Sequence, residues 1–391
     1  MTAGLSLRAA RVLTPGGLLP DAVVEIQDGL VVGVGAGDPA TAVDLGEVTL
    51  CPGFVDLHVH GNGGSWWGQS EENDRGIARR MARSGTTSCL ASLGGRQTLD
   101  EVLDSLRTTS RLVGSETGAV EILGIHMEGP FINPEKRGAW MPEQLRAPSV
   151  SELHQMQEAA AGTIKTMTIA PELPGALEVV SECIGLGIRP AIGHTNATYE
   201  EAMRGIEAGM TYSTHTYNGM RGLHHRDPGA LGAVLAAPRL DAEVIADGQH
   251  VAEGAIRVLI SARGVDQVIM VTDNVALSGL EPGEYGEGHW RVKVTEGGIT
   301  MADGTIAGSV LPFSRHFANM VGIAGIEDAS QMASLNPAGA IGLEDRKGSI
   351  TAGKDADLVA LDSEFNVVMT MTRGVVTYCL PELRKGVGGA R

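Results

Sequence analysis

The 391-residue sequence lacks the signatures of several large classes of protein. Its four cysteines, Cys51, Cys89, Cys183 and Cys379, lie far apart and form no C-x-x-C pair, so they indicate neither a disulfide framework nor a structural zinc knuckle. No apolar run approaches the ~20 residues of a membrane span, and Met1–Gly17 lacks the apolar core of an export signal. We therefore expect a cytoplasmic protein with reduced thiols and no membrane partner.

Positive charge is also scarce. The chain has 30 Lys and Arg residues against 47 Asp and Glu residues, which gives a formal net charge of -17. A mostly negative field repels polyanions and therefore disfavours nucleic acid as a partner. Any anionic substrate must meet a locally basic pocket. The hydrophobic content of 43% is sufficient for a large buried core.

From Phe54 onward, apolar segments of strand length alternate with segments of helical periodicity, such as Asp74–Arg83 and Glu200–Ala208. This alternation is typical of βαβ units around a parallel sheet. We predict an α/β fold, a (β/α)8 TIM barrel, with a doubly wound open sheet as the alternative. The eight predicted strands are Phe54–His60, Thr86–Ala91, Val120–Glu128, Lys165–Pro171, Arg189–His194, Thr211–Thr216, Glu243–Gln249 and Gln267–Asp273.

Both ends of the chain have strand-and-turn character. We predict that residues 1–53 and 348–391 together form a small β-sandwich domain and that residues 54–347 form the barrel. Two turn signals, Glu296-Gly-Gly298 and Asp303-Gly304, predict a hairpin insertion within Tyr285–Gly308. The strands predicted outside the barrel are Leu5–Leu13, Ala22–Gln27, Leu30–Val34 and Glu47–Leu50, with further strand-and-turn segments at Gly348–Asp362 and Val367–Tyr378.

Residues that bind metals or transfer protons recur at the predicted strand ends, where the active site of such a barrel forms. His58 and His60 are two apart on one strand, so their side chains project to the same side and could share one metal ion, although hydrogen-bonded core histidines have the same spacing. Glu128, His194 and His215 offer a carboxylate and two imidazoles, a set that suits zinc, iron or a similar divalent ion. Asp273 could act as a proton shuttle or as a further ligand.

Eight motifs, spread in order over essentially the whole chain, resemble those of the N-acetylglucosamine-6-phosphate deacetylases, members of the amidohydrolase superfamily. They are Pro52-Gly-Phe-Val-Asp-Leu-His-Val-His60, His126-Met-Glu-Gly-Pro-Phe-Ile-Asn-Pro-Glu-Lys-Arg-Gly138, Gly193-His-Thr-Asn-Ala-Thr198, Thr214-His-Thr-Tyr-Asn-Gly-Met220, Arg226-Asp-Pro-Gly229, Asp247-Gly-Gln-His250, Val271-Thr-Asp273 and Gly308-Ser309.

The resemblance implies a metal-dependent hydrolase that removes the acetyl group from N-acetylglucosamine-6-phosphate. By this resemblance Glu128, His194 and His215 hold the main metal ion, and Asp273 is the catalytic acid and base. His58 and His60 match members that hold a second ion bridged by Glu128. Relatives are dimers, so a homodimer is expected in which Arg226 reaches the neighbouring site. The residues expected to bind the amino sugar phosphate are Asn218, Gly219, Arg226 and His250, with His224 and His225 beside Arg226 making a basic cluster.

The sequence departs from this family at several positions near the expected site. Trp140 stands where the family usually has a histidine; its indole donates one hydrogen bond and accepts none, so it stacks on a sugar face or fills space. The runs Asn274–Gly279 and Val310–Ser314 also differ from the family pattern. Trp66 and Trp67 have no family counterpart and fit either the site mouth or a subunit contact.

Three other functions are alternatives to this one. A deacetylase of another N-acyl amino sugar, galactosamine-type or unphosphorylated, is favoured by Trp140. A cyclic-amide or N-acyl amino acid hydrolase belongs to the same superfamily. Cyclic-amide hydrolases commonly use a carboxylated lysine from strand four, whereas the fourth predicted strand here ends Thr168–Glu172 without one. A noncatalytic sugar-phosphate sensor would have no need of Asp273 beside a metal.

Overall fold

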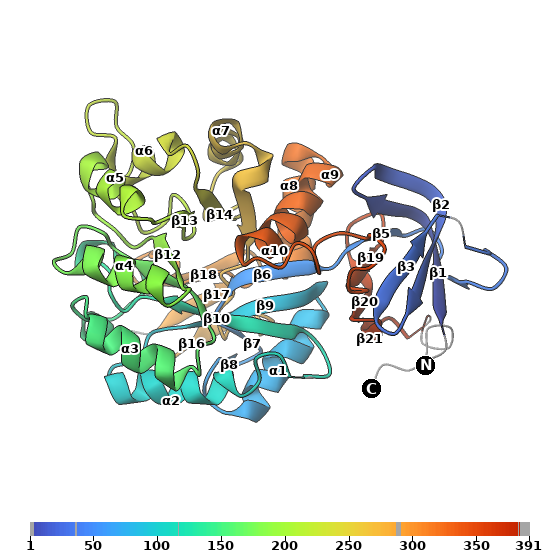
Figure 1. Ribbon diagram of the computed structural model, residues 1–391, viewed down its shortest axis with the longest axis horizontal. Coiled ribbons are helices and arrows are strands. Elements are labelled where there is room, and N and C mark those ends of the chain that lie inside the picture. The colour runs from blue at the N-terminus through green and yellow to red at the C-terminus, as the bar shows by residue number, and fades with distance from the viewer. Residues whose placement is uncertain (1–3, 36, 116, 287–290, 382, 384–391) are drawn as a thin grey trace.

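The computed structural model describes residues 4–35, 37–115, 117–286, 291–381 and 383. Its larger part is an eight-stranded parallel sheet in the order β15-β14-β13-β12-β11-β10-β9-β6 (Figure 1). Just after β15, the Asp273 main-chain N–H donates to the carbonyl of His58 on β6 at 2.8 Å, which joins the two edges of the sheet. The predicted barrel is therefore confirmed. Its strands are β6 (Phe54–Val59), β9 (Thr86–Leu93), β10 (Glu121–Glu128), β11 (Ile164–Ile169), β12 (Arg189–Ile192), β13 (Tyr212–Ser213), β14 (Asp241–Ile245) and β15 (Val268–Val271).

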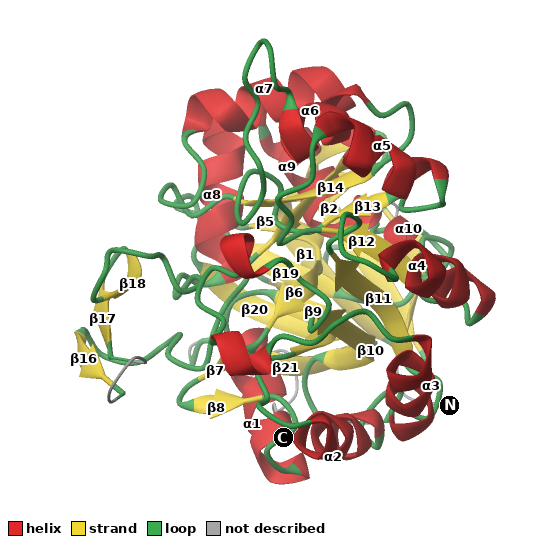
Figure 2. Ribbon diagram, turned by 90° about the vertical axis from the view of Figure 1, so that its left-hand side faces the viewer, coloured by secondary structure: helices red, strands yellow, loops and turns green. Residues whose placement is uncertain are grey.

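Helices surround the barrel strands (Figure 2). Four of the described helices begin at residues whose hydroxyl accepts a hydrogen bond from a main-chain N–H of the first turn: Ser70, Thr98, Ser149 and Thr198. Because Ser70 caps α1, this helix begins three residues before its predicted start. The helices are α1 (Glu71–Ala82), α2 (Leu99–Ser110), α3 (Val150–Ala159), α4 (Ala176–Gly185), α5 (Tyr199–Glu207), α6 (Gly229–Ala236), α7 (Glu253–Arg263), α8 (Phe313–Ala324), α9 (Ile326–Ser330) and α10 (Asn336–Ala340).

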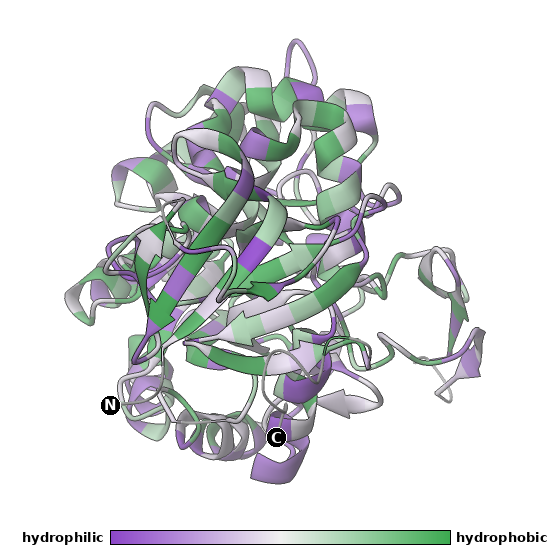
Figure 3. Ribbon diagram, turned by 90° about the vertical axis from the view of Figure 1, so that its right-hand side faces the viewer, coloured by the Kyte–Doolittle hydropathy of each residue, from purple (hydrophilic) through white to green (hydrophobic). Residues whose placement is uncertain are grey.

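The two ends of the chain form one sheet beside the barrel, at the right of Figure 1. Where a sandwich was expected, the strands are hydrogen-bonded into one continuous eight-stranded sheet with its own apolar core. Figure 3 shows hydrophobic and hydrophilic residues following one another along strands on this side. The predicted domain limits stay a prediction, and residues 1–3, 36, 382 and 384–391 of these segments lie outside the described residues. The strands are β1 (Leu5–Thr14), β2 (Gly17–Gln27), β3 (Leu30–Val34), β4 (Val43–Asp44), β5 (Thr49–Pro52), β19 (Leu358–Leu361), β20 (Val367–Thr372) and β21 (Val375–Cys379).

Two smaller β units follow barrel strands at their carboxyl ends. The hairpin of β7 (Gly61–Asn62) and β8 (Ser65–Trp66) follows β6. The predicted insertion after the last barrel strand is a three-stranded sheet of β16 (Gly283–Tyr285), β17 (Val292–Thr295) and β18 (Gly298–Met301), at the left of Figure 2. Residues 287–290 of that prediction lie outside the described residues.

Some barrel strands end earlier than predicted, because three expected site residues leave the extended conformation. His194 has φ 46°, His215 has φ 28° and Asp273 has φ 51°, values that L-residues with a Cβ adopt at an energetic cost. The hydrogen-bonded strands stop at Ile192, Ser213 and Val271. The sharp turns after these points hold the three side chains over the barrel mouth.

Candidate active site and metal centre

A cavity of about 680 Å³ opens at the carboxyl ends of the barrel strands. Its size is that of an ordinary small-molecule site. The predicted site residues that line it come from six of the eight strand ends: His60, Glu128, Trp140, His194, His215, Asn218, Gly219, His250 and Asp273. His58 lies behind them and is fully buried.

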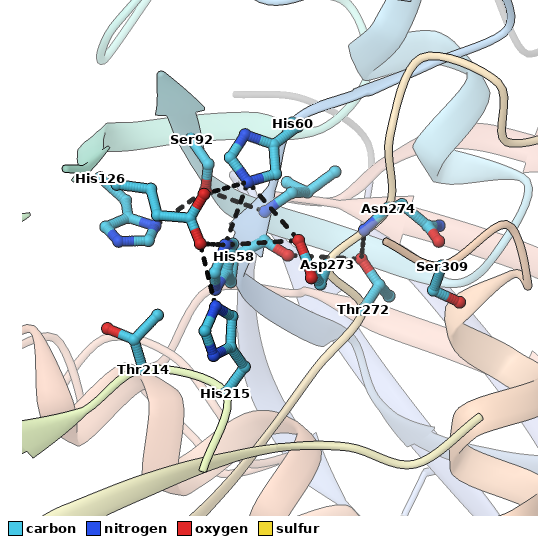
Figure 4. Close-up of polar contacts among 12 residues, drawn as sticks. His58, His60, Ser92, His126, Thr214, His215, Thr272, Asp273, Asn274 and Ser309 are labelled. Carbon is cyan, nitrogen blue, oxygen red and sulfur yellow. Dashed lines mark hydrogen bonds and ion pairs between the residues drawn. The ribbon is translucent and has the colours of Figure 1, made fainter. Parts of the chain in front are cut away.

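Six of these residues form two groups that could each hold a metal ion. We call His58, His60 and Asp273 the H-x-H group, and Glu128, His194 and His215 the Glu128 group. Figure 4 shows His58, His60, His215 and Asp273 pointing toward one another.

Glu128 joins the two groups through its two carboxylate oxygens. Its Oε1 atom lies 3.1 Å from His194 Nε2 and 3.0 Å from His215 Nε2. Its Oε2 atom lies 3.2 Å from His60 Nε2. The carboxylate therefore has the placement of a residue that bridges two cation sites.

The hydrogen bonds around the Glu128 group fit a cation between its members. His194 Nδ1 lies 2.7 Å from the Lys136 carbonyl oxygen, so Nδ1 carries the proton and the neutral ring presents a lone pair at Nε2. That lone pair faces the Glu128 oxygen and His215 Nε2, which is 3.0 Å away. Facing lone pairs repel one another, and a divalent cation bound by nitrogen and oxygen ligands removes this repulsion.

The electrostatics of the centre also favour positive charge. Burial by itself raises the pKa of the Glu128 carboxyl, but His60 and His194 hold it well below its usual range. Burial lowers the pKa of His58, yet the carboxylates of Glu243 and Asp273 raise it well above its usual value. A site that stabilises ionised carboxylates in this way is suited to a metal ion.

Asp273 has the geometry of a group that works between the metal centre and the cavity. Its Oδ1 atom is 3.4 Å from His58 Nε2 and 3.5 Å from His60 Nε2, and its side chain remains 13% exposed. The preceding residue, Thr272, donates its hydroxyl to Asp56 at 2.6 Å, and the Asp273 carbonyl accepts from the Ser309 N–H at 2.9 Å. These contacts fix the backbone on both sides of the carboxylate.

Comparison with known proteins agrees with this geometry. The sequence pattern of the amidohydrolase family matches residues 49–377. The chain belongs to the amidohydrolase family. This amidohydrolase is 32% identical to the N-acetylglucosamine-6-phosphate deacetylase of Bacillus subtilis, over 98% of this chain and 99% of that protein. It is also 32% identical to the N-acetylgalactosamine-6-phosphate deacetylase of Escherichia coli O157:H7, over 94% of this chain and 98% of that protein.

A solved structure shows the same likeness. The N-acetyl-D-glucosamine-6-phosphate deacetylase of Mycobacterium smegmatis superposes with a TM-score of 0.90, covering 96% of this amidohydrolase and 100% of that chain at 34% identity. The fold thus extends over nearly the whole of both proteins. None of the described helices combines the length and hydropathy that a membrane span needs.

The predicted substrate residues fall on two different parts of the amidohydrolase. Asn218 and His250 line the cavity; the Asn218 Nδ2 atom is buried with no hydrogen-bond partner among the described residues, and His250 Nδ1 is 2.7 Å from Asp247. Arg226 is exposed, contacts His225 at 2.8 Å and does not line the cavity of its own chain. Arg226 is therefore not among the predicted residues that the fold of one chain brings to the cavity.

The tryptophans of the amidohydrolase have distinct positions. The Trp140 indole Nε1 lies 3.3 Å from Glu128 Oε2, so Trp140 contacts the metal-centre carboxylate as well as the cavity. Trp66 lines the cavity, whereas Trp67 is a core residue whose indole donates to the Val59 carbonyl at 2.8 Å. The two tryptophans were expected either at the mouth of the site or at a subunit contact, and only Trp66 lies at the cavity.

Two charged residues at the site were not predicted from the sequence. Glu243 is completely buried and contacts His58, and Arg96 lines the cavity. An acidic residue inside the apolar strand Asp241–Ile245 is a sequence signal for Glu243, because a buried carboxylate needs a partner. Arg96 lies in a loop, where nothing in the sequence pattern distinguishes it.

Proposed function

We propose that this amidohydrolase hydrolyses the acetamide of N-acetylglucosamine-6-phosphate to glucosamine-6-phosphate and acetate. The observation that carries the proposal is the convergence of Glu128, His194, His215 and Asp273 at the floor of one cavity. Relatives that match nearly the full chain are deacetylases of amino sugar phosphates. A lysine at the end of strand β11, which a ring hydrolase commonly uses, is absent: that strand ends in Thr168 and Ile169.

The catalytic work of the chain is divided between the metal ligands and Asp273. A divalent ion in the Glu128 group would supply a Lewis acid for the acetamide carbonyl and an activated water. Asp273 accepts the proton from the attacking water and delivers it to the sugar nitrogen as the C–N bond breaks. Glu128, His194 and His215 keep their geometry through the hydrogen bonds described above, so the reacting groups stay aligned.

The ligand set supports zinc or iron as the resident ion. It consists of imidazole nitrogens and carboxylate oxygens, a mixture that suits both metals, and contains no sulfur. The Glu128 group would hold one ion, and the H-x-H group provides a place for a second. We also propose a cytoplasmic location, which the four free, buried cysteines suit.

The amino sugar phosphate is bound on the side of strands β13 and β14. The unpartnered Asn218 Nδ2 is placed to donate to the ligand, with the main chain of Gly219 beside it. His250 is oriented by Asp247, so its Nε2 is directed away from that carboxylate. Arg226 contributes from the neighbouring chain of a homodimer, where its guanidinium binds the phosphate.

A second candidate substrate is N-acetylgalactosamine-6-phosphate. Trp140 stands where the family usually has a histidine, and it directs its only polar atom at Glu128, so it offers the sugar no hydrogen-bond acceptor. The hydroxyl pattern of the sugar is therefore read by other residues. One of the relatives named above is a galactosamine-type deacetylase.

A substrate panel tests the assignment. Metal-loaded protein is incubated with N-acetylglucosamine-6-phosphate, N-acetylgalactosamine-6-phosphate or unphosphorylated N-acetylglucosamine, and acetate release is followed. We expect the highest kcat/KM for the first and a large loss without the phosphate. Preference for the galactosamine substrate would keep the chemistry and replace the sugar, whereas no release from any of them would overturn the function.

A further inference from the structure

We propose that Glu243 is a positioning residue that orients one ligand of each metal group and commits the H-x-H group to binding a second ion. The inference rests on the metal-dependent function proposed above. Glu243 lies on β14, and its side chain is completely buried. It is not one of the residues that line the cavity.

One oxygen of Glu243 makes both decisive contacts. Oε2 lies 2.9 Å from His58 Nδ1 and accepts a hydrogen bond from the His215 main-chain N–H at 2.8 Å. His58 belongs to the H-x-H group and His215 to the Glu128 group. A single buried carboxylate thus holds residues of both groups.

The contact determines which nitrogen of His58 faces the ion. Glu243 is an acceptor, so Nδ1 of His58 carries the proton and donates to it. A cation held by the H-x-H group would take the place of the second ring proton and meet the lone pair of Nε2, which is 3.1 Å from His60 Nε2 and 3.4 Å from Asp273 Oδ1. Carboxylates that bind a ligand histidine in this way fix its orientation and raise its basicity.

Because the Glu243 carboxylate is buried, its charge favours the binding of a cation nearby. No lysine or arginine among the described residues forms an ion pair with Glu243, whose other oxygen, Oε1, has no hydrogen-bond partner there. A buried carboxylate that contacts no lysine or arginine needs another positive charge nearby to offset its lost hydration. Positive charge bound at the H-x-H group and the Glu128 group offsets the charge of Glu243. His58, whose ring contacts Glu243, is the most direct link between them.

The test compares metal binding by the full-length wild type, Glu243→Gln and Glu243→Asp. Glutamine keeps the size and removes the charge, whereas aspartate keeps the charge and shortens the reach to His58. Ser88→Ala is the matched control, because Ser88 is buried in the barrel and its hydroxyl has no partner among the described residues. Zn²⁺ is added to metal-free protein, and bound ions per chain are counted by mass spectrometry alongside calorimetric affinities.

We expect two ions on wild type and on Ser88→Ala. Glu243→Gln is expected to keep the tighter ion and to bind the second one roughly 10- to 100-fold more weakly. Glu243→Asp is expected to weaken the second ion as well, and it provides the measurement if Glu243→Gln does not fold by circular dichroism. Two ions with unchanged affinities in the variants, equal loss of both ions, or a single ion on wild type would each overturn the proposal. Since no substrate is used, this result is independent of the sugar assignment.

Discussion

The indole Nε1 of Trp140 lies 3.3 Å from Oε2 of Glu128, the oxygen that also faces His60. The ring is held closely, because a Cβ added to Gly94 would lie 2.5 Å from the edge of the indole. A residue at which the sequence departs from its family therefore contacts the metal centre itself. Trp140 has the position of a group that fixes the rotamer of the bridging carboxylate.

Replacing Trp140 by phenylalanine keeps most of the ring and removes the donor. A hydrogen bond to a charged group contributes about 1.5–3 kcal/mol, so we expect kcat/KM for deacetylation to fall roughly tenfold or more while the fold is retained. Tyr285→Phe is the control, because Tyr285 lines the same cavity but its hydroxyl donates to the Glu281 carbonyl. Equal kcat/KM values for Trp140→Phe and wild type would show that the indole only fills space.

Substitution of the buried Lys347 should lower the stability of the fold strongly and leave catalysis unchanged. Lys347 is fully buried, and its Nζ atom lies 2.8 Å from Glu121, 3.0 Å from Asp355 and 2.5 Å from Asp357. These residues join the start of β10 to the terminal sheet, at the opposite end of the barrel from the cavity. Arg346 also pairs with Glu121 and Asp355, so removing Lys347 deprives Asp357 in particular of its cationic partner among the described residues.

We expect Lys347→Met to lower the free energy of unfolding by about 3–5 kcal/mol, measured by urea denaturation, with kcat of the folded enzyme unchanged. Arg107→Met provides the comparison, since Arg107 pairs with Asp104 on the exposed face of α2. Its effect should stay below about 1 kcal/mol. A similar small effect for Lys347→Met would contradict a stabilising role for the buried cluster.

The buried imidazole of His316 should make the free energy of unfolding depend on pH. Burial on α8 lowers its pKa from 6.5 to about 4. Between these values the unfolded chain binds a proton that the native state does not, so stability falls as the pH drops from 6.5 toward 4. The contribution amounts to roughly 3 kcal/mol at most.

Urea denaturation of metal-loaded protein at several pH values measures this contribution. The free energy of unfolding of His316→Gln should decline less steeply than that of wild type between pH 6.5 and 4. His154→Gln, at an exposed position on α3, should leave the wild-type slope unchanged. Parallel curves for His316→Gln and wild type would show that the imidazole is not held neutral in the native state.

The sequence was informative where local pattern determines structure. Alternating strand and helix periodicity predicted all eight barrel strands, and residue type at their ends predicted the residues that form two candidate metal groups. The strand ends at His194 and His215 were placed too late, because positive φ at a residue other than glycine leaves no sequence signal. The contact of His58 with Glu243 joins residues 185 apart, which no local pattern encodes.

The position of Arg226 shows a second limit on what could be predicted from the sequence. Its motif resembles a phosphate-binding one, yet the side chain is exposed outside the cavity of its own chain. A short motif does not determine whether the fold brings its side chain into a cavity formed by distant strands. The same holds for Trp66 and Trp67, neighbours in sequence of which one lines the cavity and the other enters the core.

The most direct test of the account is the effect of Asp273→Asn on acetate release from N-acetylglucosamine-6-phosphate. Asparagine keeps the shape of the side chain and cannot accept the water proton, so we expect kcat to fall by roughly 10²- to 10⁴-fold with the ion of the Glu128 group still bound. Wild type should release acetate and glucosamine-6-phosphate in equal amounts. Acetate release by Asp273→Asn at the wild-type rate would contradict the assignment of Asp273 and with it the proposed mechanism.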